Sequence, residues 1–498
     1  MSFTSIHFLL FFPIVTRLYF IVPYRMRWVL LVAASYYFYM SWRPWYALLL
    51  LFATAVSFVC GLLIAAEEDQ KRRKAWLIAG CAINLAVLFV FKYFDFFNVQ
   101  TRELMAAIGV DYNIPNLDLV LPVAISFHTF QVLSYLFDVY RRDVAPERHF
   151  GIFSLYVVYY PQLVAGPIER AFHFLPQLRK LLTPAPELAF DESRAISGLR
   201  LILCGFVKKL VIADNLALYV DPIYNNPGNA TGGALALATI AFAFQIYFDF
   251  SAYTDIARGC SRVMGIELIE NFRRPYLARS VAEFWKRWHI SLTSWFRDYV
   301  YLPMGGNRVS HGRWIVNVMA VFLMSGLWHG ANWTFVVWGL LHGGYYVVSR
   351  NTAAWRAGLA ERLGLLGRSG WLALWQTLAT FALVCFAWIF FRASDMTAAL
   401  TIVSSITETA LHPLAQLFGA APLAFAGKTT IASFGEPRFC FAFAALVLFG
   451  LWEIRREYRD INFAELAVWQ RWSAYYAACL AIVVIGNMGN KQFIYFQF

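Results

Sequence analysis

The sequence has little charge for its length. Asp, Glu, Lys and Arg make up 14% of the 498 residues, whereas 60% of the residues are hydrophobic and the mean hydropathy is +0.54. Soluble domains are usually about a quarter charged, so water is not the main solvent of this chain. Apolar runs of about 20 residues recur along the sequence, which predicts helices that cross a lipid bilayer.

Several patterns that define other classes of protein are also missing. The seven cysteines are single and scattered, without the paired spacing of a metal site or a disulfide framework. We find no phosphate-binding glycine loop, no internal repeat and no alternating pattern of barrel strands. The net charge of +12 comes from clusters between apolar runs, not from a basic domain. This distribution disfavours nucleic-acid binding and favours contact with anionic lipid.

These features predict an all-α polytopic membrane protein with about 11–12 transmembrane helices and additional re-entrant and interfacial helices. We interpret it as one integral membrane domain, 1–498, with N-terminal helices (1–248), a core region that contains His289 and His329 (249–349) and C-terminal helices (350–498). The stretch 155–167 is short and broken, as expected of a re-entrant segment. The predicted spans are 4–22 (a retained first span rather than a signal peptide), 28–41, 45–66, 76–97, 119–139, 195–220, 233–256, a broken pair within 314–349, 371–391, 438–454 and 470–488.

The basic residues predict the orientation of these spans. Loops rich in Lys and Arg stay in the cytoplasm because their translocation is disfavoured. We therefore place 71–74, 141–142, 350–368 and 455–459 inside, and the base-poor loops 98–118, 221–232 and 393–436 outside. Alternation through these loops predicts that both termini are extracytoplasmic.

Four charged residues interrupt the apolar runs. Lys208 and Lys209 lie within 195–220, where we expect them to shorten the span or to reach towards its edge. Asp249 and Asp255 lie near the end of another run, and we expect them to pair with nearby arginines, because buried carboxylates are usually paired.

The region 249–349 contains the residues suited to chemistry. Its part from 271 to 313 combines many charges with many aromatic rings, as expected of interfacial amphipathic helices. An apolar run follows that is too long for one span and is interrupted around Gly330 and Asn332, which places His329 on irregular structure near mid-membrane. An ionisable residue at membrane depth indicates a functional site. A neutral buried imidazole can act as a general base.

Two histidine motifs carry a family resemblance. The segment FWKRWHISLTSWFRDYVYLPMGGNR contains His289, and SGLWHGANWTFVVWGLLHG contains His329. Together they resemble the double signature of the membrane-bound O-acyltransferases, most closely the bacterial alginate O-acetylation branch. Further resemblance lies in LPVAISFHTFQVLSYLFDVYR, YYPQLVAGPIER, FAWIFFRA and the C-terminal FIYFQF, so it extends over nearly the whole chain.

The resemblance implies acyl transfer from a thioester to a hydroxyl, at a centre reached by a tunnel. His329 and His289 would be the catalytic residues, with no bound cofactor or metal, and with acetyl-CoA or another acyl thioester as the donor substrate. Independently of the resemblance, the chemistry of acyl transfer predicts that Asn332 or Trp328 stabilises the oxyanion and that Ser325 supports the site or carries an acyl group. Lys286, Arg287 and Arg297 would bind donor phosphates or anchor to anionic lipid. We expect His128 and His342 to be helix-packing residues.

The function expected from these features is that of a bacterial inner-membrane O-acetyltransferase. It would pass acetyl groups from a cytoplasmic donor towards an extracytoplasmic polysaccharide such as alginate, with the help of an extracytoplasmic acetyltransferase partner protein. D-alanyl transfer to teichoic acid and peptidoglycan acetylation would use the same mechanism. A transporter for a lipid-linked sugar is an alternative of another class, which the lack of an internal repeat disfavours.

Overall fold

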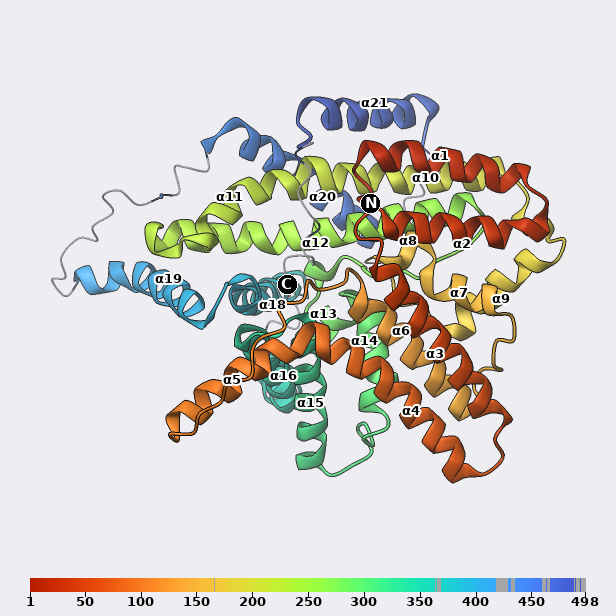
Figure 1. The fold of residues 1–498 in the computed structure, drawn as a ribbon. Coiled ribbons are helices and arrows are strands. Elements are labelled where there is room, and N and C mark those ends of the chain that lie inside the picture. The colour runs from red at the N-terminus through yellow and green to blue at the C-terminus, as the bar shows by residue number, and fades with distance from the viewer. Residues whose placement is uncertain are drawn as a thin grey trace. The chain divides into compact units, whose positions relative to one another are not determined.

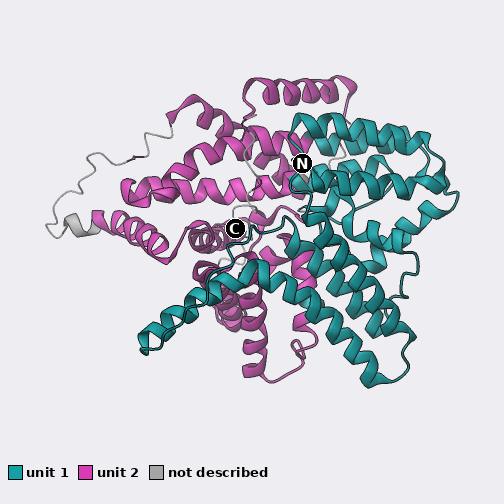
Figure 2. Ribbon diagram, viewed as in Figure 1, with its two compact units in different colours: residues 1–203, 253–270, 297–299 teal, residues 204–252, 271–296, 300–498 magenta. Residues whose placement is uncertain are grey.

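The structure is a computed structural model, and it describes residues 1–164, 166–362, 364, 369–417, 429–430, 435–458, 463, 466–487, 489 and 493. The regular elements in these ranges are helices, and the β-type pairing among them is limited to a bridge between Ala230 and Thr429. The predicted all-α class is therefore confirmed. The chain folds into two compact units that alternate along the sequence (Figure 2): unit 1 is 1–203, 253–270 and 297–299, and unit 2 is 204–252, 271–296 and 300–498. The predicted single domain and its three regions stay predictions.

Unit 1 has α6 (Ile125–Arg141) at its centre. This helix packs against α3, α4, α7 and α9, and most of its side chains are buried, including the polar His128, Gln131 and Asp138. Helices rather than lipid surround α6, which explains how it carries polar groups. The other helices of unit 1 are α1 (Ile6–Ile21), α2 (Tyr24–Met40), α3 (Tyr46–Ala66), α4 (Gln70–Leu88), α5 (Phe94–Ala107), α7 (Phe150–Val158), α8 (Tyr160–Leu163), α9 (Ala171–Arg179) and most of α10 (Glu192–Phe206) (Figure 1).

Unit 2 contains the helical hairpin of α15 (His311–His329) and α16 (Trp333–Asn351). The two helices approach most closely at Gly326 and Gly339, where a Cβ atom would collide with the carbonyl oxygens of Phe335 and Phe322. Glycine is therefore required at this crossing. The other helices are a π-helix (Val207–Ala213), α11 (Asp214–Asn225), the first part of α12 (Gly232–Val263), α13 (Val281–Arg287), α14 (Ile290–Phe296), α17 (Ala353–Arg362), α18 (Ser369–Arg392), α19 (Met396–Leu417), α20 (Pro437–Tyr458) and α21 (Val468–Val484) (Figure 1).

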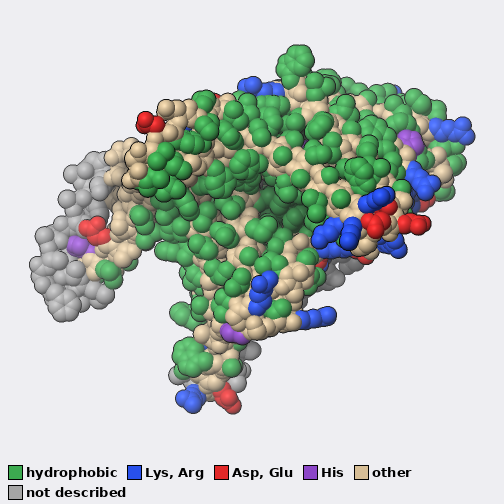
Figure 3. All heavy atoms as spheres, turned by 60° about the horizontal axis from the view of Figure 1, so that its bottom comes forward, with side chains coloured by type: hydrophobic (Ala, Val, Ile, Leu, Met, Phe, Trp, Pro, Cys, Tyr) green, Lys and Arg blue, Asp and Glu red, His purple; other side chains and the backbone are tan. Residues whose placement is uncertain are grey.

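The structure contains helices that are long and apolar enough to cross a membrane. Five stretches among the described residues are long and apolar enough: Tyr46–Ala66, Gln70–Ala107, Gly232–Val263, Gly370–Arg392 and Pro437–Arg455. Hydrophobic side chains cover most of the face shown in Figure 3, and charged side chains gather in groups near its edge. Such a surface suits lipid rather than water. Each predicted span overlaps a helix, although the span 119–139 begins six residues before α6 and the span 195–220 runs through α10, a π-helix and α11. The count of 11–12 crossings and the tunnel stay predictions.

Two predicted loops were wrong in part. The predicted loop 393–436 contains α19, and the predicted loop 98–118 begins only after α5 ends at Ala107. Continuous apolar runs reveal membrane spans, but they do not reveal amphipathic helices such as α19, whose apolar residues are mixed with Ser and Thr. The stretch 155–167 is broken as predicted, because α7 ends before Tyr159 and α8 begins after it. Its entry into the bilayer stays a prediction.

The expectation that Lys209 reaches towards an edge was also wrong. Lys209 is buried, and its Nζ lies 2.9 Å from Asp214 and 2.7 Å from Asp249. It does not reach towards an edge, because two carboxylates supply the hydrogen bonds that water would otherwise supply. Asp249 therefore pairs with a lysine, whereas Asp255 has the predicted arginine partner, Arg258, at 4.0 Å.

Candidate functional site

The break predicted in the apolar run lies at the end of α15. His329 is the last residue of this helix and is 4% exposed. Gly330 follows, and a Cβ atom there would collide with the ring of Phe335. Asn332 is the N-cap residue of α16, and its side-chain oxygen accepts the backbone N–H of Thr334 at 3.1 Å. Glycine and an N-cap residue thus end one helix and begin the next beside the imidazole.

His289 lies between α13 and α14 in an unusual conformation. Its φ is +42°, in the left-handed region, and its side chain is fully buried. Asn271 holds the chain there: its carbonyl oxygen accepts the Ile290 N–H at 3.0 Å, and its side-chain oxygen accepts the Ser291 N–H at 3.2 Å. Left-handed residues other than glycine cost about 1–3 kcal/mol and gather at functional sites. Burial lowers the pKa of His289 to about 3, so its imidazole is neutral.

Trp328 brings the two motif histidines together. Its ring centre lies 4.9 Å from that of His329 and 6.0 Å from that of His289, and both imidazoles meet the indole nearly edge to face. His329 is further enclosed by Trp338 at 5.0 Å and by Phe391 at 5.2 Å. We call these five residues the His–Trp cluster. Residues 40 positions apart along the chain thus share one aromatic enclosure in unit 2.

A third histidine adjoins this cluster, and the sequence analysis assigned it to helix packing. The His342 ring centre lies 5.0 Å from that of Trp338, and His342 Nδ1 accepts the Nε1–H of Trp285 at 3.3 Å. Because an indole nitrogen only donates, this bond places the His342 proton on Nε2. The sequence signal was the four-residue spacing of Trp338 and His342, which puts both on one face of α16.

Ser325 and Asn332, the other two predicted residues of this site, lie on either side of the break after His329. Ser325 is buried one turn before His329 on α15, where it can reach the same enclosure. The Asn332 amide donates to the Ser394 carbonyl at 2.9 Å in addition to capping α16. These bonds give Asn332 a structural task, and its contact with an oxyanion stays a prediction.

The three predicted donor-binding cations do not form one group. Arg287 lies 2.7 Å from Glu283 and 2.9 Å from Glu457, whereas Lys286 on the same helix is exposed. Arg297 is exposed, belongs to unit 1 and pairs with Asp298 at 2.7 Å. Two carboxylates pair with Arg287, and the binding of donor phosphates by any of these three cations stays a prediction.

The geometry suits proton transfer in a water-poor enclosure. Aromatic walls exclude water and strengthen electrostatic interactions inside. A neutral imidazole can take the proton of a hydroxyl as that oxygen attacks an activated carbonyl, and it can return the proton to a leaving thiolate. The cluster thus offers the base that acyl transfer to an alcohol requires.

Comparison with known proteins agrees with this chemistry. The profile of the "MBOAT, membrane-bound O-acyltransferase family" matches residues 148–359. The chain is 36% identical to the "Probable alginate O-acetylase AlgI" of Pseudomonas aeruginosa over 84% of this chain and 77% of that protein. It is 32% identical to the protein of the same name from Pseudomonas putida over the full length of both. A "Peptidoglycan O-acetyltransferase" of Helicobacter pylori is 33% identical over 76% of this chain and 73% of that protein. The chain therefore belongs to the membrane-bound O-acyltransferase family, as a multi-pass membrane protein with acyltransferase activity.

Proposed function

We propose that this chain transfers acetyl groups from a cytoplasmic thioester, such as acetyl-CoA, for O-acetylation of an extracytoplasmic polysaccharide such as alginate. The observation that supports this proposal best is the enclosure of His289 and His329 against the single indole of Trp328. The names of the Pseudomonas relatives support alginate as the acceptor. The chain would reside in the bacterial inner membrane with both termini outside, and an extracytoplasmic acetyltransferase partner would receive the acetyl group or complete the transfer.

His329 acts as the general base in this proposal. The acceptor oxygen attacks the thioester carbonyl carbon while His329 takes the hydroxyl proton. The resulting tetrahedral intermediate collapses, the C–S bond breaks, and the imidazolium returns the proton to the leaving thiolate. The products are an acetyl ester and a free thiol, and the thioester is activated enough that no further reactant is needed. Trp328 Nε1–H or the Asn332 amide stabilises the oxyanion, and Ser325 lies within one helical turn of the base.

The test compares two histidines of the same helix. His329→Ala should lower the ester-linked acetate on purified surface polysaccharide by at least about 100-fold, the lower range of general-base catalysis. His311→Ala is the matched control, because His311 begins α15 and is exposed. Membrane content of each variant is measured by immunoblot. Wild-type acetate in the His329 variant, at normal protein content, would refute the assigned role.

Peptidoglycan is a second candidate acceptor, because the Helicobacter relative is a peptidoglycan O-acetyltransferase. The same cells separate the two candidates when acetate is quantified on isolated peptidoglycan and on exopolysaccharide. Loss of acetate from peptidoglycan alone would select the second candidate. A change in D-alanine on teichoic acid, with acetate unchanged on both polymers, would select aminoacyl transfer instead.

A further inference from the structure

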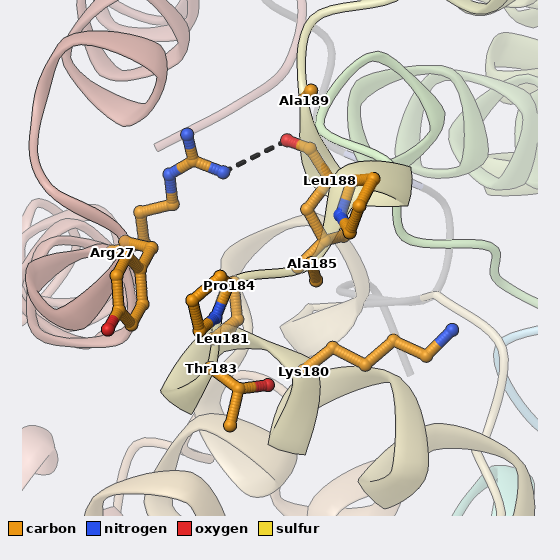
Figure 4. Close-up of a pocket in the computed structure, with 10 residues that line it drawn as sticks. Arg27, Lys180, Leu181, Thr183, Pro184, Ala185, Leu188 and Ala189 are labelled. Carbon is orange, nitrogen blue, oxygen red and sulfur yellow. Dashed lines mark hydrogen bonds between the residues drawn. The ribbon is translucent and has the colours of Figure 1, made fainter.

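Unit 1 contains a cavity of about 310 Å³ that is separate from the His–Trp cluster in sequence and in composition. It is formed by the first turn of α2 and by the segment 180–189, which holds two short 3₁₀ helices, Lys180–Leu182 and Pro186–Leu188. Figure 4 shows Arg27 on one side of this cavity and Lys180 on the other. Its volume is at the lower end of the range for ligand sites, which suits a headgroup rather than a whole lipid.

Arg27 has no carboxylate partner among the residues that the structure describes. One of its terminal nitrogens donates to the Leu188 carbonyl at 2.9 Å (Figure 4), and the guanidinium lies over the Tyr19 ring at 4.8 Å. Its Nε is buried without a hydrogen-bond partner in the described part of the chain. A carbonyl and an aromatic ring leave the full positive charge uncompensated, and a guanidinium matches phosphate in shape and charge.

Two further cations and the start of α2 lie near Arg27, and Glu187 offsets one of these cations. The Arg194 guanidinium donates hydrogen bonds to the carbonyl oxygens of Glu187 and Ala189. Lys180 forms a salt bridge with Glu187 at 2.8 Å. Tyr24, which lines the cavity, is the first residue of α2, and no acidic residue stands in the first turn of that helix. The positive end of the helix dipole therefore adds to the field of the cations.

The position and the apolar lining indicate the source of the anion. The cavity lies at the tip of the hairpin of α1 and α2, and α1 exposes large apolar side chains such as Leu10, Ile14 and Ile21. Leu181, Pro184 and Pro186 line it. Beside the cavity, the exposed ring of Phe190 packs against the ring of Phe20, with 5.4 Å between the ring centres. Aromatic and apolar groups next to cations at the end of a membrane hairpin are typical of headgroup depth.

We infer that this cavity binds the phosphodiester headgroup of an anionic phospholipid, with the phosphate on Arg27 and the lipid chains against Phe20 and Phe190. Lys180 lies at the opposite wall, where Glu187 offsets its charge, so Arg27 is the cation on which the assignment rests. The inference is independent of the acceptor and the donor of acyl transfer. It predicts a lipid requirement for stability that persists in a catalytically dead His329→Ala protein.

The experiment uses the full chain in a neutral detergent. Thermal unfolding is followed while phosphatidylglycerol, phosphatidylcholine or inorganic phosphate is added. We expect a saturable rise of the unfolding temperature with phosphatidylglycerol and little change with the other two. Arg27→Gln should weaken the apparent affinity for phosphatidylglycerol about tenfold, because a charge-assisted pair is lost. Arg25→Gln is the matched control, since Arg25 lies two residues earlier on α2, is exposed and does not line the cavity.

A second variant guards against misfolding of the Arg27 protein. Ala185→Phe fills the cavity without changing its charge, and it should also abolish the phosphatidylglycerol response. Equal responses to phosphatidylglycerol and phosphatidylcholine would overturn the proposal, and so would equal losses in the Arg25 and Arg27 variants. An equal response to inorganic phosphate would replace the lipid with a soluble anion and refute the assignment as stated.

Discussion

The conformation of His289 allows its imidazole to be tested separately from its backbone. At φ +42° the residues that fit most easily are glycine, asparagine and aspartate, with histidine next. The residue can therefore be present for its backbone or for its ring. Asparagine and glycine suit this backbone and remove the ring, whereas alanine removes the ring and keeps the Cβ strain that histidine already carries.

The contacts give the expected sizes. Every substitution loses the edge-on contacts to Phe250 at 4.7 Å and to Trp328 at 6.0 Å, which are worth about 0.5–1.5 kcal/mol each, or about 1–3 kcal/mol together. Histidine and alanine both place a Cβ in the left-handed region, so His289→Ala adds no new Cβ strain, whereas His289→Gly relieves about 1 kcal/mol of it. We therefore expect a cost of about 1–3 kcal/mol for alanine and for asparagine, and about 0–2 kcal/mol for glycine.

The assay pairs thermal unfolding of the purified variants with ester-linked acetate on surface polysaccharide. If the imidazole takes part in catalysis, all three variants lose acetate by at least about tenfold, the size of a lost 1.4 kcal/mol interaction, although glycine is the most stable of them. Wild-type acetate in the asparagine or glycine variant would refute a role of the ring. It would show that His289 is present to turn the chain between α13 and α14.

Three further predictions concern stability, measured by thermal unfolding in one detergent. Gly326→Ala should destabilise unit 2 by about 1–3 kcal/mol because the new Cβ collides with the Phe335 carbonyl oxygen. The control is Gly344→Ala on α16, which has open space around it and should be neutral or stabilising. Equal effects of the two substitutions would contradict the close crossing of α15 and α16. Lys209→Met should cost about 3–5 kcal/mol because two buried carboxylates lose their cation, whereas the exposed Lys286→Met should change stability by less than about 0.5 kcal/mol. A Lys209 variant as stable as the Lys286 variant would contradict the buried ion pairs. His342→Phe should cost about 1–3 kcal/mol, since it leaves the Trp285 N–H buried without an acceptor; wild-type stability would show that this hydrogen bond is not formed.

The sequence was sufficient to predict the features that local residues determine. The break after His329 was predictable because Gly330 and Asn332 favour a helix end and a helix start whatever surrounds them. The motif histidines were predictable as a pair, because their segments resemble one family. The approach of both rings to Trp328 was not, since no local rule states which of the many indoles of this chain lies near both.

The remaining features depend on residues that are distant in the chain. Lys209 meets Asp249, and Trp285 meets His342, only after the helices have packed. Neither pair has a spacing that a periodicity search can detect. α19 was not predicted because it contains no continuous apolar run. Its apolar residues lie on one face of the helix instead. Of the C-terminal motif 493–498, only Phe493 lies in the described residues, where its ring contacts Phe250 at 5.6 Å.

The π-helix Val207–Ala213 makes unit 2 sensitive to chain length rather than to side-chain identity. A π turn holds one residue more than an α turn, and it commonly arises from a single inserted residue. If the same residues formed a regular α-helix, Lys209 and Asp214 are five positions apart and would lie about 140° apart around the helix axis. Asp214 would then point away from Lys209, although the sequence would be unchanged. Homologous chains that differ here by one residue should thus be aligned by helix phase before their charged residues are equated.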